Sequence, residues 1–348
     1  MPAPFVFLSN PLNVSFLLCI IKWKYYVQEL QELTMQLLVW LGVILLVMLY
    51  TMQSLLTKLY TDRYPGKPDM ASTVLTVVSG LTVAFITFFC FELCSFTFNP
   101  WCILIGVLNA VALYGYNYFI VKASQSGPYS ILMMFSLAGG IVIPIVASLI
   151  MGWDEAWNTP FRVIVNVVCI VAIISAVYLV SNRPEENAAK KQITLPFILS
   201  CLGLAICNGT YGIFLTLQQQ TAAAGGEGNR GEMVITTFLA AAMISFVIGL
   251  VKERGNFFSC FKQTKGSLIF LIATSVVFAL AINLIVIIIP YFDTTILYTI
   301  DNSSVLIMSV LISWIFFKEK LTRLNVVGIV IMCAALVSMN LLPAIINL

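Results

Sequence analysis

The chain has 348 residues, of which 60% are hydrophobic and only 9% are charged. A soluble domain carries about 25% charged residues, so this composition excludes an ordinary globular protein and predicts an all-α polytopic membrane protein. The formal net charge is +3, and the basic residues are scattered among short loops, which argues against a nucleic-acid partner.

The sequence contains no histidine. This absence removes histidine-based catalytic triads, HExxH zinc sites and histidine-ligated haem, so we expect neither an enzyme nor a metal site or cofactor. The 9 cysteines lie mostly within apolar runs and form no CxxC pair, which favours a packing role for them. No glycine-rich phosphate loop with a lysine is present, which argues against ATP-driven transport within this chain.

The first 34 residues form an unusual extension. Its apolar run is broken by Pro11 and followed by Lys22 and Lys24, which is the reverse of a signal peptide. Two interpretations stay open, a marginal extra span or a true start at Met35.

From Met35 onward, ten apolar segments are long enough to cross a ~30 Å hydrocarbon layer as helices. The first five are Gln36–Leu56, Ala71–Leu93, Trp101–Val121, Pro128–Met151 and Phe161–Ser181. A hydrophilic connector occupies residues 182–194. The second five begin at about Pro196 and are Pro196–Leu217, Met233–Val251, Leu268–Ile289, Thr294–Phe317 and Leu324–Leu342. We therefore expect two five-helix repeats, at residues 35–181 and 195–348.

The predicted fourth and fifth spans, with their turn, align without a gap with the ninth and tenth at an offset of 319 − 155 = 164, which places Glu155 on Glu319 and Cys169 on Cys333. An odd number of spans in each half inverts the second half relative to the first. Inverted repeats are a recurrent transporter design with a binding site near the midplane. Basic residues gather on one set of alternating loops, which the positive-inside rule makes cytoplasmic. Both termini, counted from Met35, are then expected outside.

The ninth predicted span contains Asp301 among apolar residues. A carboxylate near the bilayer centre costs roughly 2.5–3.5 kcal/mol on insertion scales, so it usually faces a bundle interior or a wet cavity. Asp301 is therefore the first candidate for a substrate or ion site, and the alternative is an interhelical hydrogen-bonding strut. Other polar residues at helical spacing complete the predicted cavity: Tyr298, Asn302, Asn283, Asn109, Tyr116, Asn117, Asn208, Tyr211, Tyr50 and Gln53.

Two pairs of small residues lie in the predicted fourth and sixth spans. They are Gly139-Gly140 and Gly209-x-x-Gly212. We expect both pairs to permit close helix packing rather than to bind a ligand.

The stretch FFKEKLTRLNVVGIVIM, at 316–332, joins the predicted ninth and tenth spans by a short charged turn. With the five-plus-five pattern, this stretch resembles the drug/metabolite transporter superfamily, specifically its EamA-like ten-helix members. The resemblance implies a basket of helices around a central cavity lined by the first, third, fourth, sixth, eighth and ninth spans. It also implies movement of small organic solutes by alternating access.

The functional expectation is a transporter that moves a small organic metabolite or drug across the inner membrane, with export as one direction. Its partners would be the lipid bilayer, a small-molecule substrate and a proton or sodium ion for coupling. One carboxylate among amides and phenols suits a zwitterionic or weakly cationic metabolite. The alternative is a non-transporting membrane sensor or scaffold, in which Asn109, Asn208 and Asp301 would bond one another in a dry core. A membrane enzyme is a third possibility and a channel a fourth.

Overall fold

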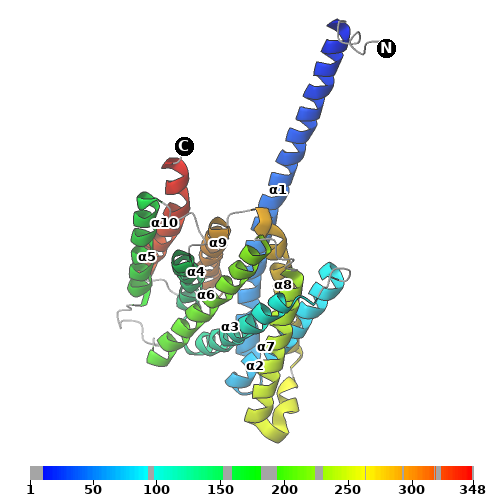
Figure 1. Ribbon diagram of the computed structural model, residues 1–348. Helices are drawn as coiled ribbons and strands as arrows, with labels where there is room; N and C mark the ends of the chain where they lie inside the picture. Colours follow the sequence, from blue (N-terminus) through cyan, green and yellow to red (C-terminus); the bar gives the residue numbers. More distant parts are fainter. Residues whose placement is uncertain are drawn as a thin grey trace. The chain divides into compact units, whose positions relative to one another are not determined.

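The computed structural model describes residues 11–92, 98–151, 159–181, 194–223, 230–262, 264–291, 294–316, 318 and 323–346. Within these ranges the regular structure is helical and no strand occurs, which confirms the all-α prediction (Figure 1). The chain divides into two units, residues 1–45 and residues 46–348, and the functional features described below all lie in the second. Residues 182–193 of the predicted connector and Glu319 of the charged turn lie outside the described residues.

The described residues form ten α-helices, and each of the ten apolar segments of the sequence lies largely on one of them. They are α1 (Pro11–Arg63), α2 (Pro68–Ile86), α3 (Pro100–Ser126), α4 (Tyr129–Met151), α5 (Pro160–Ser181), α6 (Leu195–Ala223), α7 (Arg230–Glu253), α8 (Lys265–Ile288), α9 (Thr294–Phe316) and α10 (Arg323–Ile346). Three short helical segments accompany them: η2 (Thr87–Glu92), η5 (Arg254–Phe261) and η6 (Ile289–Tyr291).

Six of these helices contain stretches long and apolar enough to cross a membrane. The stretches are Leu37–Arg63, Asp69–Cys90, Pro100–Ser126, Leu195–Gln218, Gly231–Glu253 and Lys265–Ile288. In α4, α5, α9 and α10 the apolar stretches found among the described residues are shorter, from 10 to 17 residues. The chain is therefore a multi-pass membrane protein, and a count of ten spans stays a prediction.

Helix α1 runs without interruption from Pro11 to Arg63, past the predicted end of the first span at Leu56. Lys58, expected in a loop, thus lies on the helix and is buried, with 6% of its surface exposed. Its ammonium donates to the carbonyl oxygen of Ser124 at 2.5 Å and pairs with Asp62 at 2.9 Å. Carbonyls in the last turn of a helix lack helical partners and attract cations, so Lys58 caps α3.

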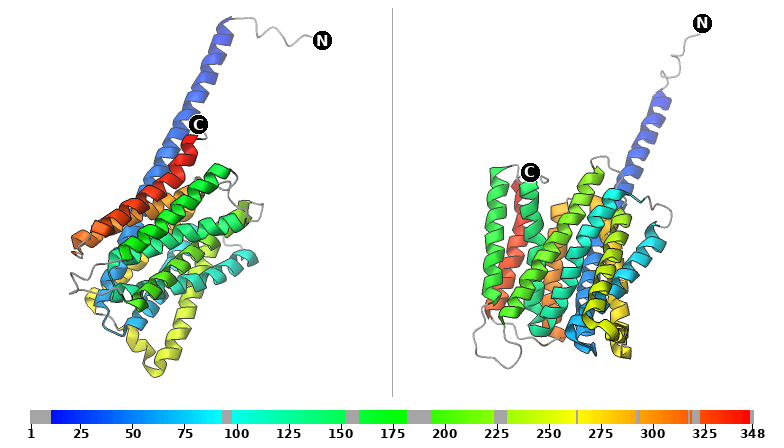
Figure 2. Two further views of the ribbon diagram at one scale, coloured as in Figure 1. Left: turned by 90° about the vertical axis from the view of Figure 1, so that its left-hand side faces the viewer. Right: turned by 60° about the horizontal axis from the view of Figure 1, so that its bottom comes forward.

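Within the second unit, contacts between helices follow a few strong pairings. Helix α3 packs against α6 and α7, α2 against α7 and α8, α4 against α6 and α9, and α5 against α10. Figures 1 and 2 show α5 and α10 side by side and α4 next to α9.

The outward surface of these helices is apolar. On α3, for example, the exposed side chains include Leu104, Val107, Leu108 and Val111, which recur at the helical period and form one stripe. An exposed apolar stripe on a long apolar helix is what lipid contact requires. The polar side chains of α3, such as Asn109, lie on the buried side.

Glycines set the distance between α4 and α6. A Cβ atom on Gly139 would collide with the backbone of Ala205, and one on Gly209 would collide with Ile143 and the carbonyl of Gly139. The two helices therefore approach backbone to backbone, as small residues at membrane helix interfaces allow. The expectation of close packing is met for these two members of the glycine pairs.

Gly139→Ala should destabilise the fold by about 1–3 kcal/mol, because the rigid backbone of Ala205 cannot yield to the added methyl group. Gly266→Ala is the matched control: the nearest atom to its Cβ would be Arg63 Cδ at 3.9 Å, and alanine favours the helix. Thermal unfolding in detergent should show a lower Tm for Gly139→Ala and an unchanged or higher Tm for Gly266→Ala. Equal Tm values would contradict the close α4–α6 packing.

Candidate functional site

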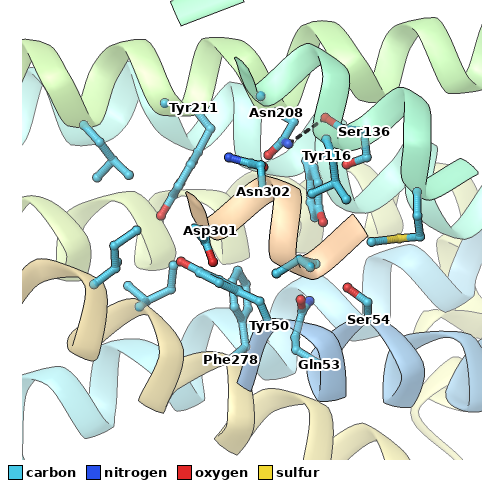
Figure 3. Close-up of a pocket in the computed structure, with 18 of the residues that line it drawn as sticks. Tyr50, Gln53, Ser54, Tyr116, Ser136, Asn208, Tyr211, Phe278, Asp301 and Asn302 are labelled. Carbon is cyan, nitrogen blue, oxygen red and sulfur yellow. Dashed lines mark hydrogen bonds between the residues drawn. The ribbon is translucent and has the colours of Figure 1, made fainter. Parts of the chain in front are cut away.

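A cavity of about 100 Å³ lies in the second unit (Figure 3). Its walls come from α1, α3, α4, α6, α8 and α9, which are the six helices that the resemblance implies for a substrate cavity. The lining residues are Tyr50, Gln53, Ser54, Leu113, Tyr116, Met133, Ser136, Leu137, Gly140, Asn208, Tyr211, Gly212, Leu215, Phe278, Ile282, Ile285, Asp301, Asn302 and Val305. Residues from both predicted repeats thus meet at one space.

Asp301 is the charged residue of the lining. It projects from α9, and only 6% of its surface is exposed. Its Oδ1 atom has no hydrogen-bond partner in the protein. Figure 3 shows the hydroxyl ends of Tyr50 and Tyr211 directed toward the Asp301 carboxylate, with the ring of Phe278 beside them. Phenols and a ring from three other helices therefore surround one carboxylate.

Amide groups form a second part of the cavity wall. The side-chain nitrogen of Asn208 donates to the carbonyl oxygen of Ser136 at 2.8 Å, which joins α6 to α4 (Figure 3). A Cβ atom on Gly140 would lie 2.6 Å from the Asn208 amide nitrogen and 3.2 Å from the Asn302 amide oxygen. Gly140 therefore leaves room for two amides from α6 and α9, a role that the packing interpretation of this glycine did not include.

The structure brings most of the predicted site residues together. The cavity is lined by seven of them: Tyr50, Gln53, Tyr116, Asn208, Tyr211, Asp301 and Asn302. In each case a polar side chain on an apolar helix points inward, which is the outcome that the cost of placing it in lipid dictates. These seven side chains come from four helices, α1, α3, α6 and α9.

Four predicted residues are placed elsewhere or not described. Asn109 and Asn117 are buried in α3 but do not line the cavity. Asn283 donates to Thr87 Oγ1 at 2.9 Å and to the carbonyl of Ala279 at 2.8 Å, so it ties α8 to η2 as a strut. Tyr298 lies on α9, but its side chain is outside the described part of the structure.

The cavity also contains residues that sequence reasoning passed over. Most are apolar and carry no signal that separates them from packing residues: Leu113, Met133, Leu137, Leu215, Phe278, Ile282, Ile285 and Val305. Leu137 did have a signal, because it is the residue that the offset of 164 pairs with Asp301 (137 + 164 = 301). The two positions that this predicted alignment pairs, Leu137 and Asp301, both line the cavity, one apolar and one charged.

The cavity lining carries negative charge only. Asp301 supplies its carboxylate, and neither lysine nor arginine lines the cavity. Among the described residues, no group of three or more histidine, cysteine, aspartate or glutamate side chains lies together. The cavity can pair with a positive charge and can hydrogen-bond neutral groups.

A second polar cluster lies where α1, α7 and η5 end, away from the cavity. The Tyr64 hydroxyl donates to the carbonyl of Cys260 at 3.0 Å, and Lys67 pairs with Glu253 at 2.7 Å. Desolvation, reinforced by Cys260 and Glu253, raises the pKa of Tyr64, and the hydrogen bond to Glu253 raises the pKa of Lys67. We call these two pairs the end ties. Both connect the first predicted repeat to the second.

Comparisons with known proteins establish the fold and leave the family open. No protein-family profile matches the sequence, and no curated protein matches it. Among 28 matching chains of solved structures is one described only as a crystal structure of a protein. It aligns with a TM-score of 0.57 and 14% identity over 87% of this chain and 96% of that chain. The fold of nearly the whole chain therefore occurs in a protein whose structure has been solved.

Cysteines introduced into the cavity should be reachable by small reagents. Ser54→Cys and Ser136→Cys, in a variant whose native cysteines are replaced, should react with a small cationic methanethiosulfonate, because both positions line the cavity. Ser275→Cys is the control, since Ser275 is fully buried in α8, does not line the cavity and donates to the carbonyl of Leu271 at 2.8 Å. Mass spectrometry would measure labelling. A dry core would leave all three unlabelled.

Proposed function

We propose that this protein is a carrier of the EamA-like drug/metabolite transporter type. It moves a small organic solute across the inner membrane by alternating access, and export is the direction to test first. The observation that carries the proposal is the cavity: a chain with an apolar outer surface holds an internal space where amides, hydroxyls and a buried carboxylate lie among apolar side chains. A polar interior is costly in a membrane protein and is typical of substrate pathways.

The packing of the helices supports ten spans in two inverted repeats. In that arrangement α2, α4 and α5 correspond to α7, α9 and α10, and each of these helices packs against its counterpart. The pair α3 and α7 corresponds to the pair α8 and α2, and both pairs are in contact. A two-fold axis between the repeats produces both kinds of contact: a helix packed against its own counterpart, and a contact that recurs between the counterparts of its two helices. Such an axis suits a substrate site at the repeat interface.

The end ties supply a natural gate. They connect the two proposed repeats at one end, on the side that the distribution of basic residues makes cytoplasmic. Alternating access by rocking of the repeats requires contacts of this kind to form and break in turn. Lys67 of the ion pair is largely exposed, which suits this task because ion pairs that reach solvent contribute little net stability.

A non-transporting scaffold is the second candidate, and the strut made by Asn283 is the feature that favours it. A scaffold needs its polar side chains to bond one another. Asn208 instead bonds a backbone carbonyl and lines the cavity together with Asp301, while Asn109 does not line it. This distribution favours the carrier.

Transport and its dependence on Asp301 can be measured in liposomes that hold a pH-sensitive dye, with small amines and amino acids added outside. Asp301→Asn should lower solute-dependent flux at least about tenfold, a loss of ~1.4 kcal/mol of interaction with the solute or coupling ion. Glu232→Gln is the matched control: it neutralises a fully buried carboxylate of α7 that does not line the cavity, and it should keep its flux.

Three outcomes of this experiment differ in meaning. Loss of flux in Asp301→Asn alone supports a carrier with Asp301 at its centre. Equal flux in both variants keeps the carrier and makes Asp301 a structural residue. Absence of flux in the unaltered protein, measured with the dye and with radiolabelled solutes, favours the scaffold.

The gate can be tested by reversing one ion pair. Lys67→Glu places two carboxylates together and should expose Cys260 to a maleimide several-fold faster, because the Tyr64 and Lys67 contacts break together. Adding Glu253→Lys restores opposite charges and should restore the slow rate. The rate is read in a variant that keeps Cys260 as its sole cysteine. A double variant that labels as fast as Lys67→Glu would contradict the gate.

A further inference from the structure

The carboxylate of Asp301 lacks a positive partner within the lining of the cavity. Its Oδ1 atom accepts no hydrogen bond from the protein, and no lysine or arginine lines the space around it. The buried lysine of α1, Lys58, does not line the cavity and is engaged by Asp62 and the Ser124 carbonyl. A carboxylate held in an apolar interior is strongly stabilised by a cation that enters beside it.

The surroundings of this carboxylate are aromatic. Tyr50, Tyr211 and Phe278 come from three helices and lie around Asp301 (Figure 3). The faces of aromatic rings attract cations, and they do so most strongly where water is excluded. The carboxylate, the tyrosine hydroxyl ends directed toward it and the ring of Phe278 together suit an ammonium group that carries carbon substituents.

The rest of the lining offers little to an anion. It consists of apolar side chains, hydroxyls and neutral amides, and the Asn208 amide already donates to the Ser136 carbonyl. A carboxylate carried by the same small solute would lie close to Asp301 in a space only about 100 Å³ in volume. Like charges at such a distance repel strongly in a medium of low dielectric constant.

We infer that the cavity takes a small monovalent organic cation, with its ammonium group against Asp301, and discriminates against zwitterions and anions of the same size. The inference rests on the proposed carrier function and narrows its substrate class, because a zwitterionic metabolite is no longer expected. Size sets a further limit: a cavity of ~150 Å³ holds one benzene molecule, so one of about 100 Å³ accepts solutes of roughly four or five heavy atoms.

Four probes of matched size separate the effects of charge. Ethanolamine is a cation, ethylene glycol is its neutral counterpart, glycine is a zwitterion and glycolate is an anion. Tetramethylammonium adds a cation that relies on aromatic contact alone. Binding is measured as the thermal stabilisation of the purified full chain in detergent, at constant ionic strength, since a ligand that binds only the folded state raises Tm.

Ethanolamine or tetramethylammonium should reach half-maximal stabilisation at a concentration at least about tenfold lower than any of the other three probes. Asp301→Asn should abolish this preference, and Glu232→Gln should retain it. Phe278→Leu keeps an apolar side chain of similar reach and should weaken tetramethylammonium more than ethanolamine. A variant that fails to fold is recognised by its own Tm. In that case the comparison of the four probes on the unaltered protein tests the inference.

The inference is overturned if glycine or glycolate stabilises the protein as well as the cations do, or if neither cation stabilises it. Its failure is distinguishable from failure of the carrier. Cation binding without flux in liposomes would leave the inference standing and remove the transport function. Flux of a zwitterion or an anion would do the reverse.

Discussion

A carboxylate without a counter-charge, enclosed by apolar helices, is the constraint on which the organisation of this protein depends. In a membrane, helices satisfy their own backbone groups, so each polar side chain must find an interior partner or a wet space. Asp301 lines the cavity together with residues from five other helices. The close approach of α4 and α6 at Gly139 and Gly209 belongs to the same arrangement, because it brings Asn208 within reach of the Ser136 carbonyl.

Much of the fold follows from the cost of exposing polar groups to lipid, which is why the sequence predicts it well. Apolar length predicts each helix, and polar residues within apolar runs predict the side that faces inward, as Asp301 and Asn208 illustrate. The spacing of polar residues does not predict whether an inward-facing side chain lines a cavity or bonds a neighbouring helix. Asn109, Asn117 and Asn283 are buried as their spacing requires, yet none lines the cavity, because a buried amide can equally join two helices, as Asn283 does.

The features that sequence reasoning missed are those that depend on contacts between distant segments. Phe278 is one apolar residue among many on α8, and only the arrangement of the helices places its ring beside Asp301. The glycine pairs show the same limit. Gly139 and Gly140 are adjacent in sequence, but one lies against the backbone of Ala205 and the other leaves room for two amides. Helical geometry turns neighbouring residues by about 100°, so two such residues rarely share a role.

One helix links the cavity to the end ties. Tyr50 and Tyr64 are fourteen residues apart on and just beyond α1, which corresponds to roughly 21 Å at ~1.5 Å per residue. A helix transmits displacement along its axis because its hydrogen bonds are internal and repeated. Release of Tyr64 and Lys67 at the end of α1 would therefore move Tyr50, Gln53 and Ser54 in the cavity wall as one body. A cation seated between Tyr50 and Asp301 would then be bound by residues of both proposed repeats, so its affinity would depend on how the repeats are set against each other. In the proposed carrier, binding and gating would in this way be coupled through a single helix.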